Sequence, residues 1–107
     1  MTNELKLLTE VLILTKYKSI ITTYTALANE NILADTSSAA FTITLPIAAV
    51  AGDVIHIIDS DGTFATNNLT VARNGHKIRG VAADLTLNVN WADVELVYVD
   101  ASIGWRY

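Results

Sequence analysis

The feature that most constrains the fold is a series of short apolar runs separated by turn residues. In one run Phe41, Ile43 and Leu45 alternate with threonines, which is the period of two expected of a half-buried strand. The remaining runs cover residues 53–59, 69–73, 77–79, 85–89, 94–99 and 105–107. Residues 53–59 are apolar on both faces and predict a central strand. Short strands at this spacing predict an all-β domain, which we expect to be a compact antiparallel β-sandwich or a barrel-like fold.

The dipeptide Asn74-Gly75 is the sharpest local signal in the sequence. Asn-Gly between two apolar runs is typical of a two-residue type I′ turn, in which both central residues need a positive φ. We therefore predict a hairpin whose strands end at Arg73 and begin at Lys77.

Composition changes near residue 30. Residues 1–30 contain neither glycine nor proline, and all the glycines and the proline follow. We divide the chain into an N-terminal arm (1–30) and a β-domain (31–107). For the arm we expect a short helix or turn over residues 3–9 and then an extended segment, because residues 19–25 are rich in β-branched residues. Whether residues 1–15 are helix or strand is left open.

The arm contains an apolar run that one face of a sheet cannot hide. Two interpretations stand side by side: a contact with another subunit or a protein scaffold, or a central strand of the domain's own core. For the first, the contact residues would be Leu7, Leu8, Val11, Leu12, Ile13, Leu14 and Tyr17.

The balance of apolar and charged residues bears on partners. The chain is 51% hydrophobic and 17% charged, above and below the usual values for soluble domains. We expect part of its surface to be covered by partner chains, in a homotrimer. A net charge of -4 argues against nucleic-acid binding, which needs clustered Lys and Arg. The apolar run of residues 5–14 is short of the ~20 residues that cross a bilayer, so we expect no membrane partner.

From Tyr24 to Tyr107 the chain resembles a β-module that recurs in phage tail-fibre and virion-appendage proteins. The most specific stretches that carry the resemblance are 67–80 and 84–88, and further stretches are 35–37, 41–46, 51–53, 57–62, 64–66, 96–98 and 105–106. The resemblance implies a small β-domain that trimerises and serves structure or adhesion rather than catalysis. It also implies a location in the virion, assembled in the host cytoplasm.

The chain begins with Met and has no shaft, collagen-like repeat or heptad series. A compact chain of this length cannot span the distance that a fibre must. We therefore expect a capsid decoration (cement) protein that stabilises the shell, with the major capsid protein or other virion proteins as partners. The alternative is a tail-fibre or spike component that binds a host glycan receptor.

Candidate chemistry is sparse, and we expect no enzyme, no metal site and no cofactor. Asp59 and Asp61 beside Gly62 faintly resemble a calcium loop, but the further oxygen ligands are missing, so we favour a turn in which Asp caps local amides. His56 and His76 have no matched spacing. We expect His56 to be a hydrogen-bonded core or interface residue and His76 to be a solvated turn residue.

The C-terminal third holds four large aromatic residues, Trp91, Tyr98, Trp105 and Tyr107. We favour packing in the core and at a subunit seam, with Trp105 in the core. Trp91 and Tyr107 are the candidates for an adhesive, sugar-stacking surface if the alternative function holds.

Overall fold

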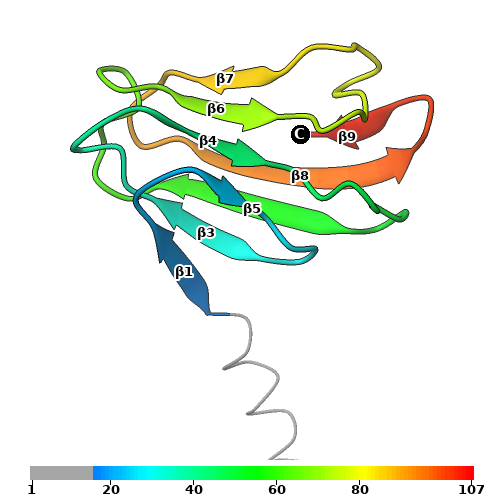
Figure 1. Ribbon diagram of the computed structural model, residues 1–107, viewed down its shortest axis with the longest axis horizontal. Coiled ribbons are helices and arrows are strands. Elements are labelled where there is room, and N and C mark those ends of the chain that lie inside the picture. Colours follow the sequence, from blue (N-terminus) through cyan, green and yellow to red (C-terminus); the bar gives the residue numbers. More distant parts are fainter. Residues whose placement is uncertain (1–15) are drawn as a thin grey trace, which may run out of the picture.

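A computed structural model describes residues 16–107, which form two facing β-sheets and no helix (Figure 1). The first sheet has the strand order β1-β3-β5-β8-β9 and the second the order β2-β4-β6-β7. The strands are β1 (Tyr17–Ile20), β2 (Tyr24–Thr25), β3 (Asn31–Ala34), β4 (Phe41–Thr44), β5 (Val54–Asp59), β6 (Leu69–Ala72), β7 (Leu85–Leu87), β8 (Asp93–Asp100) and β9 (Gly104–Arg106). The expected all-β class is confirmed.

The chain winds between the two sheets before it reverses. β1, β3 and β5 pair in parallel in the first sheet, and β2, β4 and β6 pair in parallel in the second. The chain crosses from the first sheet to the second and returns, so β1–β2–β3 and then β3–β4–β5 each complete one turn of a short two-sheet solenoid (Figure 1). The antiparallel strands β7, β8 and β9 then complete the sheets.

The expectation of antiparallel pairing throughout is wrong, because the sheets are mixed. Successive strands up to β6 lie in opposite sheets, so neighbours in sequence are not neighbours in a sheet. A turn signal between two strands marks a change of direction, but it does not tell whether the chain returns in the same sheet or crosses to the facing one.

The core lies between the sheets and follows the alternation seen in the sequence. Along β4 the buried positions are Phe41 and Ile43, and along β5 every second residue is buried. β5 is the central strand of its sheet, as predicted. The residues on its inner face are buried, whereas those on its outer face are only half-buried. Trp105 is fully buried and packs edge-on against Tyr98, so its expected core position is confirmed.

The Asn74-Gly75 turn forms as predicted, but the hairpin does not. Both residues have positive φ (52° and 84°), and the amide of His76 donates to the carbonyl of Arg73 at 3.2 Å. These are the features of a type I′ turn. However, β6 pairs with β7, whereas Ile78 makes isolated bridges to Val81 and Trp105. The turn thus directs the chain across the sandwich toward β9.

The described part of the predicted arm is extended, and β1 and β2 are paired within the two sheets. The boundary drawn at residue 30 falls immediately before β3. Tyr17, one of the predicted contact residues, is 49% exposed on the edge strand β1, and its ring lies 5.7 Å from that of His56. The other predicted contact residues lie outside the described residues: Leu7, Leu8, Val11, Leu12, Ile13 and Leu14.

Candidate interaction surfaces

The winding gathers the loops at two opposite ends of the sandwich (Figure 1). The β2–β3, β4–β5, β6–β7 and β8–β9 connections lie at one end, on the right of the view. The β1–β2, β3–β4, β5–β6 and β7–β8 connections lie at the other. The two ends expose different side chains, and different contacts fix the loops that carry them.

The first end exposes large hydrophobic side chains on all four of its loops. The β4–β5 loop contributes two of them, Ile47 and Val50, at 72% and 63% exposed. We call this surface the apolar end, and define it by Leu27, Ile47, Val50, Val81 and Ile103. A soluble monomer rarely gathers exposed apolar side chains in this way, and such patches usually mark interaction sites.

Backbone hydrogen bonds join the β2–β3 loop to the start of β5. Asn29, which has a positive φ of 67°, donates its amide to the carbonyl of Val54 at 2.8 Å. The Asn29 side-chain oxygen accepts the amide of Val54 in return, at 3.0 Å. Asn tolerates this backbone conformation better than other non-glycine residues. The pair fixes Leu27 relative to the loop that carries Val50.

His76 joins the β6–β7 connection to the β4–β5 loop. Its Nε2 lies 2.7 Å from the carbonyl oxygen of Ile47. Because a carbonyl only accepts, Nε2 carries the proton, and Nδ1 can accept from the Tyr98 hydroxyl at 3.4 Å. His76 lies next to the Asn74-Gly75 turn, as expected, but it is half-buried and hydrogen-bonded to another loop, which was not predicted.

The β8–β9 turn is held by close backbone contact. The amide of Gly80 donates to the carbonyl of Ile103 at 2.9 Å, which places Val81 next to Ile103. Gly104 has a φ of 72°, and a Cβ there would lie 1.8 Å from the carbonyl oxygen of Lys77. Only glycine permits this approach, so the apolar end has a fixed backbone under its exposed side chains.

The opposite end is organised by the buried carboxylate of Asp59. One oxygen accepts the amides of Gly62 and Thr63, at 3.0 and 3.2 Å, and the other accepts those of Phe64 and Trp91, at 3.1 and 2.9 Å. One side chain therefore fixes both the β5–β6 and β7–β8 loops. The expectation that Asp caps local amides is confirmed for the β5–β6 loop, and the bond to Trp91 was not predicted.

Trp91 is the exposed aromatic residue of this end. It is 69% exposed and has a φ of 66°, a conformation that costs a bulky residue about 1–2 kcal/mol. Its ring lies across Gly62, because a Cβ on that glycine would be 2.4 Å from ring carbons Cε2 and Cζ2. Gly62 thus leaves the space that the indole occupies.

Tyr107, the other candidate adhesive aromatic, does not lie beside Trp91. It follows Arg106, which pairs with Val97 in the middle of β8, whereas Trp91 precedes that strand. The Arg79 guanidinium stacks on the Tyr107 ring at 3.6 Å from its centroid and donates to the Tyr107 carbonyl. The structure therefore does not combine the two aromatics into one surface.

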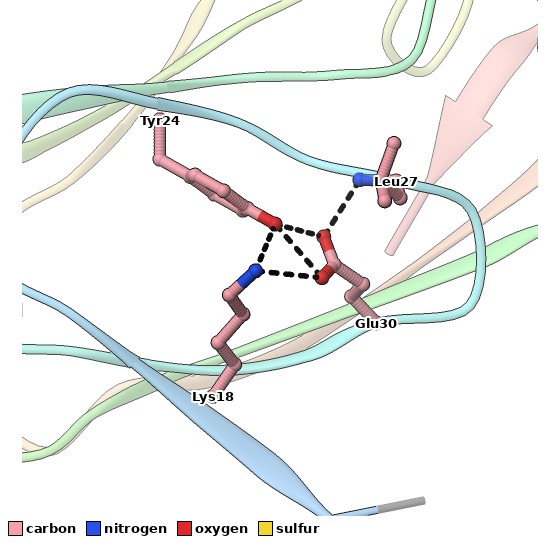
Figure 2. Close-up of polar contacts among 4 residues, drawn as sticks. All are labelled: Lys18, Tyr24, Leu27 and Glu30. Carbon is pink, nitrogen blue, oxygen red and sulfur yellow. Dashed lines mark hydrogen bonds and ion pairs between the residues drawn. The ribbon is translucent and has the colours of Figure 1, made fainter. Parts of the chain in front are cut away.

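A polar cluster spans the first turn of the winding (Figure 2). The Lys18 ammonium on β1 donates to the Tyr24 hydroxyl on β2 at 3.0 Å, and that hydroxyl lies 2.8 Å from both carboxylate oxygens of Glu30. Glu30 also accepts the amide of Leu27 at 2.7 Å. The cluster therefore connects both edge strands to the loop that carries the first residue of the apolar end.

The electrostatics of the cluster favour its charged form. The hydrogen bond to Tyr24 and, to a smaller extent, the Glu30 carboxylate raise the pKa of Lys18 above its usual value of 10.5. Lys18 also lies over the Tyr24 ring, 4.8 Å from its centroid. The side chains are solvent-accessible, so the cluster orients the edge strands more than it stabilises the fold.

His56 lies on the outer face of the first sheet, in a row of polar and aromatic side chains. Its Nδ1 is 3.2 Å from the Asn31 side-chain oxygen, and its Nε2 is 2.5 Å from the Asp93 carboxylate. The expected hydrogen bonding of His56 is confirmed, but the expected core position is wrong, because the buried residues of β5 are its neighbours Ile55 and Ile57. The same row continues through Asn31 to Tyr17 on β1, whereas the next row of this face holds Ser19, Leu33 and Ile58.

Residues 16–107 show no group of three or more His, Asp and Glu side chains that could bind a metal ion, and no pocket. Within this range, no helix is long and apolar enough to span a bilayer.

Sequence reasoning missed the residues that hold the two ends. Asn29, His76 and Gly104 contact residues that are distant in sequence, and local sequence patterns do not predict such contacts. A positive φ at Asn29 could have been suspected, because Asn is enriched in the left-handed region. Nothing in the sequence indicated the pairing of Asp59 with Trp91.

Comparison with known proteins gives one informative match. The chain is 37% identical over 89 residues to the baseplate wedge protein gp10 of Enterobacteria phage T4. The match covers 79% of this chain but 14% of that protein, so the chain spans about a seventh of its relative's length. No family model matches the sequence. The similarity supports a phage structural protein as the class of this chain.

Proposed function

We propose that the chain is a structural module of a phage particle that joins a larger protein assembly through its apolar end, without catalytic activity. One observation carries the proposal, namely five exposed large hydrophobic side chains on four loops of one end. Hydrogen bonds between those loops fix the backbone that carries these side chains before any partner binds. A prearranged surface loses less conformational entropy on binding.

The size of the apolar end predicts how it is used. Burying one fully exposed Val, Leu or Ile side chain contributes about 1.5–3 kcal/mol, and these five are 40–72% exposed, so together they contribute roughly 4–9 kcal/mol. Association costs an estimated ~4–15 kcal/mol, so this surface alone gives weak pairwise binding. Copies arranged in a symmetric particle bind more tightly through multivalency. A homotrimer, expected from the sequence, is part of the proposal.

The relative's name supports a position in the tail, at or near the baseplate. The capsid decoration role, which was expected from the sequence, is the alternative outcome of the test. The test separates purified particles into heads and tails and quantifies the chain in each by mass spectrometry. We expect it in the tail fraction at tens of copies or fewer, whereas hundreds of copies in the head fraction would support the shell.

The apolar end is tested by a matched pair of substitutions. Ile47 and Ile21 are both 72% exposed, but Ile21 belongs to the β1–β2 loop at the opposite end. We expect Ile47→Asp to prevent incorporation into particles and Ile21→Asp to be incorporated normally. Normal incorporation of both variants would exclude the apolar end as the assembly surface.

A further inference from the structure

The two tryptophans have opposite environments, and this draws attention to Trp91. Trp105 is 0% exposed in the core, whereas Trp91 is 69% exposed in the β7–β8 loop. One face of the Trp91 indole lies on Gly62, so the opposite face is directed to solvent. A fixed aromatic ring with one free face can stack on a flat apolar surface of a ligand.

The backbone of Trp91 is held in a conformation that is unfavourable for a bulky residue. Its φ of 66° is an outlier for a bulky side chain, and its amide is fixed by the buried Asp59 carboxylate at 2.9 Å. Gly62 under the ring belongs to the loop that the same carboxylate fixes. The ring is therefore presented to solvent by two loops and one buried side chain.

The exposed apolar surface around Trp91 is smaller than that of the apolar end. Within the part of the chain that the structure describes, Ile21 and Val89 are the other exposed large hydrophobics of this end. Ile21 follows β1, and three strand spacings of about 4.8 Å separate β1 from β8, which Trp91 precedes. Trp91 and Val89 are therefore two neighbouring exposed hydrophobic side chains in one loop, whereas the apolar end has five such side chains on four loops.

Asn90 precedes Trp91 in the chain and adds an oriented polar group to the same loop. Its side-chain oxygen accepts the amide of Ala65 at 2.8 Å, which fixes the orientation of the amide group. Its Nδ2 donors bond to none of residues 16–107 in the structure. An oriented amide donor in the same loop as an exposed aromatic ring suits a ligand that has both a C–H face and hydroxyl groups.

We propose that Trp91 and Asn90 form a saccharide-binding site, in which the C–H face of a pyranose ring stacks on the free face of the indole. A sugar hydroxyl accepts a hydrogen bond from Nδ2 of Asn90. The site goes beyond the assembly function, because it lies at the end opposite the apolar end and uses none of its residues.

The test uses the indole N–H signals of the full chain in two-dimensional NMR. Trp91 and Trp105 give one signal each, and the buried Trp105 serves as an internal reference. The probes are the methyl glycosides of glucose, galactose and N-acetylglucosamine at millimolar concentrations. We expect at least one glycoside to shift the Trp91 signal progressively while the Trp105 signal stays in place.

Two variants show whether the named groups bind the sugar. Trp91→Gly removes the ring at a positive φ that glycine adopts freely, and we expect the folded protein to lose binding. Asn90→Asp keeps the acceptor for the Ala65 amide but removes the donors, so we expect binding about tenfold weaker. Tyr107→Phe should bind as the parent does.

Three results would overturn the proposal. The first is that none of the glycosides shifts the Trp91 signal. The second is that the Trp91→Gly variant still binds, as judged by shifts of the backbone amides of the β5–β6 loop. The third is that the Trp91 signal changes with protein concentration and not with sugar, because Trp91 would then be a contact between chains.

Discussion

The two ends of the sandwich are held in different ways, although the same winding produces both. At the apolar end, Asn29, His76 and Gly104 each join a different pair of segments. At the opposite end, the single carboxylate of Asp59 fixes two loops through four amides. Distributed contacts should tolerate the loss of any one, whereas the opposite end should depend on one residue.

The difference also fits what each end exposes. The apolar end offers several side chains over a broad area, which suits a protein partner whose contacts are individually weak. The opposite end offers one aromatic ring in a fixed orientation, which suits a small ligand. Mutations that remove the support of one end and spare the other can therefore test whether the two ends are independent.

The largest effect is expected from Asp59→Ala. Four amide donors lose a charged acceptor, and the one on Phe64 is buried, so we expect the protein to lose about 4 kcal/mol or more of unfolding free energy. The exposed neighbour Asp61 provides the control, because Asp61→Ala should change stability by less than about 0.5 kcal/mol. Urea denaturation measures both, and equal stabilities of the two variants would show that the end does not depend on Asp59.

Gly104 and Gly75 form the next pair, both with positive φ at or near the apolar end. Gly104→Ala should cost about 3 kcal/mol, because its Cβ would collide with the Lys77 backbone in addition to the strain in φ. Gly75 has open space around it, so Gly75→Ala should cost only about 1 kcal/mol. Thermal unfolding of both variants gives the comparison. A similar loss for both would mean that the close approach at Gly104 contributes little.

A smaller and pH-dependent effect is expected at the Lys18 cluster. The pKa of Lys18 is raised in the folded protein, so the charged lysine stabilises the fold fully below its unfolded value of 10.5. This stabilisation is lost as the pH rises through the folded-state pKa. We expect Lys18→Met to melt slightly below the parent at neutral pH and the difference to disappear at strongly alkaline pH. A difference that stays constant across this range would exclude the charge as its cause.

The smallest effect on folding is expected from Ile47→Asp, since the side chain is exposed and its backbone carbonyl still accepts from His76. The unfolding free energy of the isolated protein should change by less than about 0.5 kcal/mol. If the apolar end also holds the trimer, the mass measured by light scattering should fall from three times 11.6 kDa toward the monomer mass of 11.6 kDa. A destabilised variant would show that Ile47 supports the fold instead.

Much of the strand content could be predicted because the evidence for it is local. The alternation around Ile43, the run before Asp59 and the Asn74-Gly75 turn each depend on residues a few positions apart. Strand pairing depends on whether the chain returns to the same sheet or crosses to the facing sheet after a turn. Neither the alternation of apolar residues nor the turn residues determine this. The parallel winding was therefore missed, and Lys77 was assigned to a hairpin strand that does not form.

The candidate surfaces were harder to predict for the same reason. Trp91 was named as an adhesive candidate, but its exposure depends on Asp59 at the end of β5 and on Gly62 in the loop that follows β5. Tyr107 looked equivalent in the sequence, yet Arg79 covers one face of it. The apolar end brings together side chains from four loops, so no contiguous stretch of sequence announces it.

The most direct test of assembly through the apolar end is an electron cryo-microscopy map of intact phage particles. We predict that the two-sheet fold lies in the tail with Ile47 and Val50 packed against a neighbouring protein chain. The loop that carries Trp91 should face solvent in the same map. Density that shows Ile47 and Val50 exposed to solvent, with the opposite end packed against the particle, would contradict the proposed orientation and the role of the apolar end.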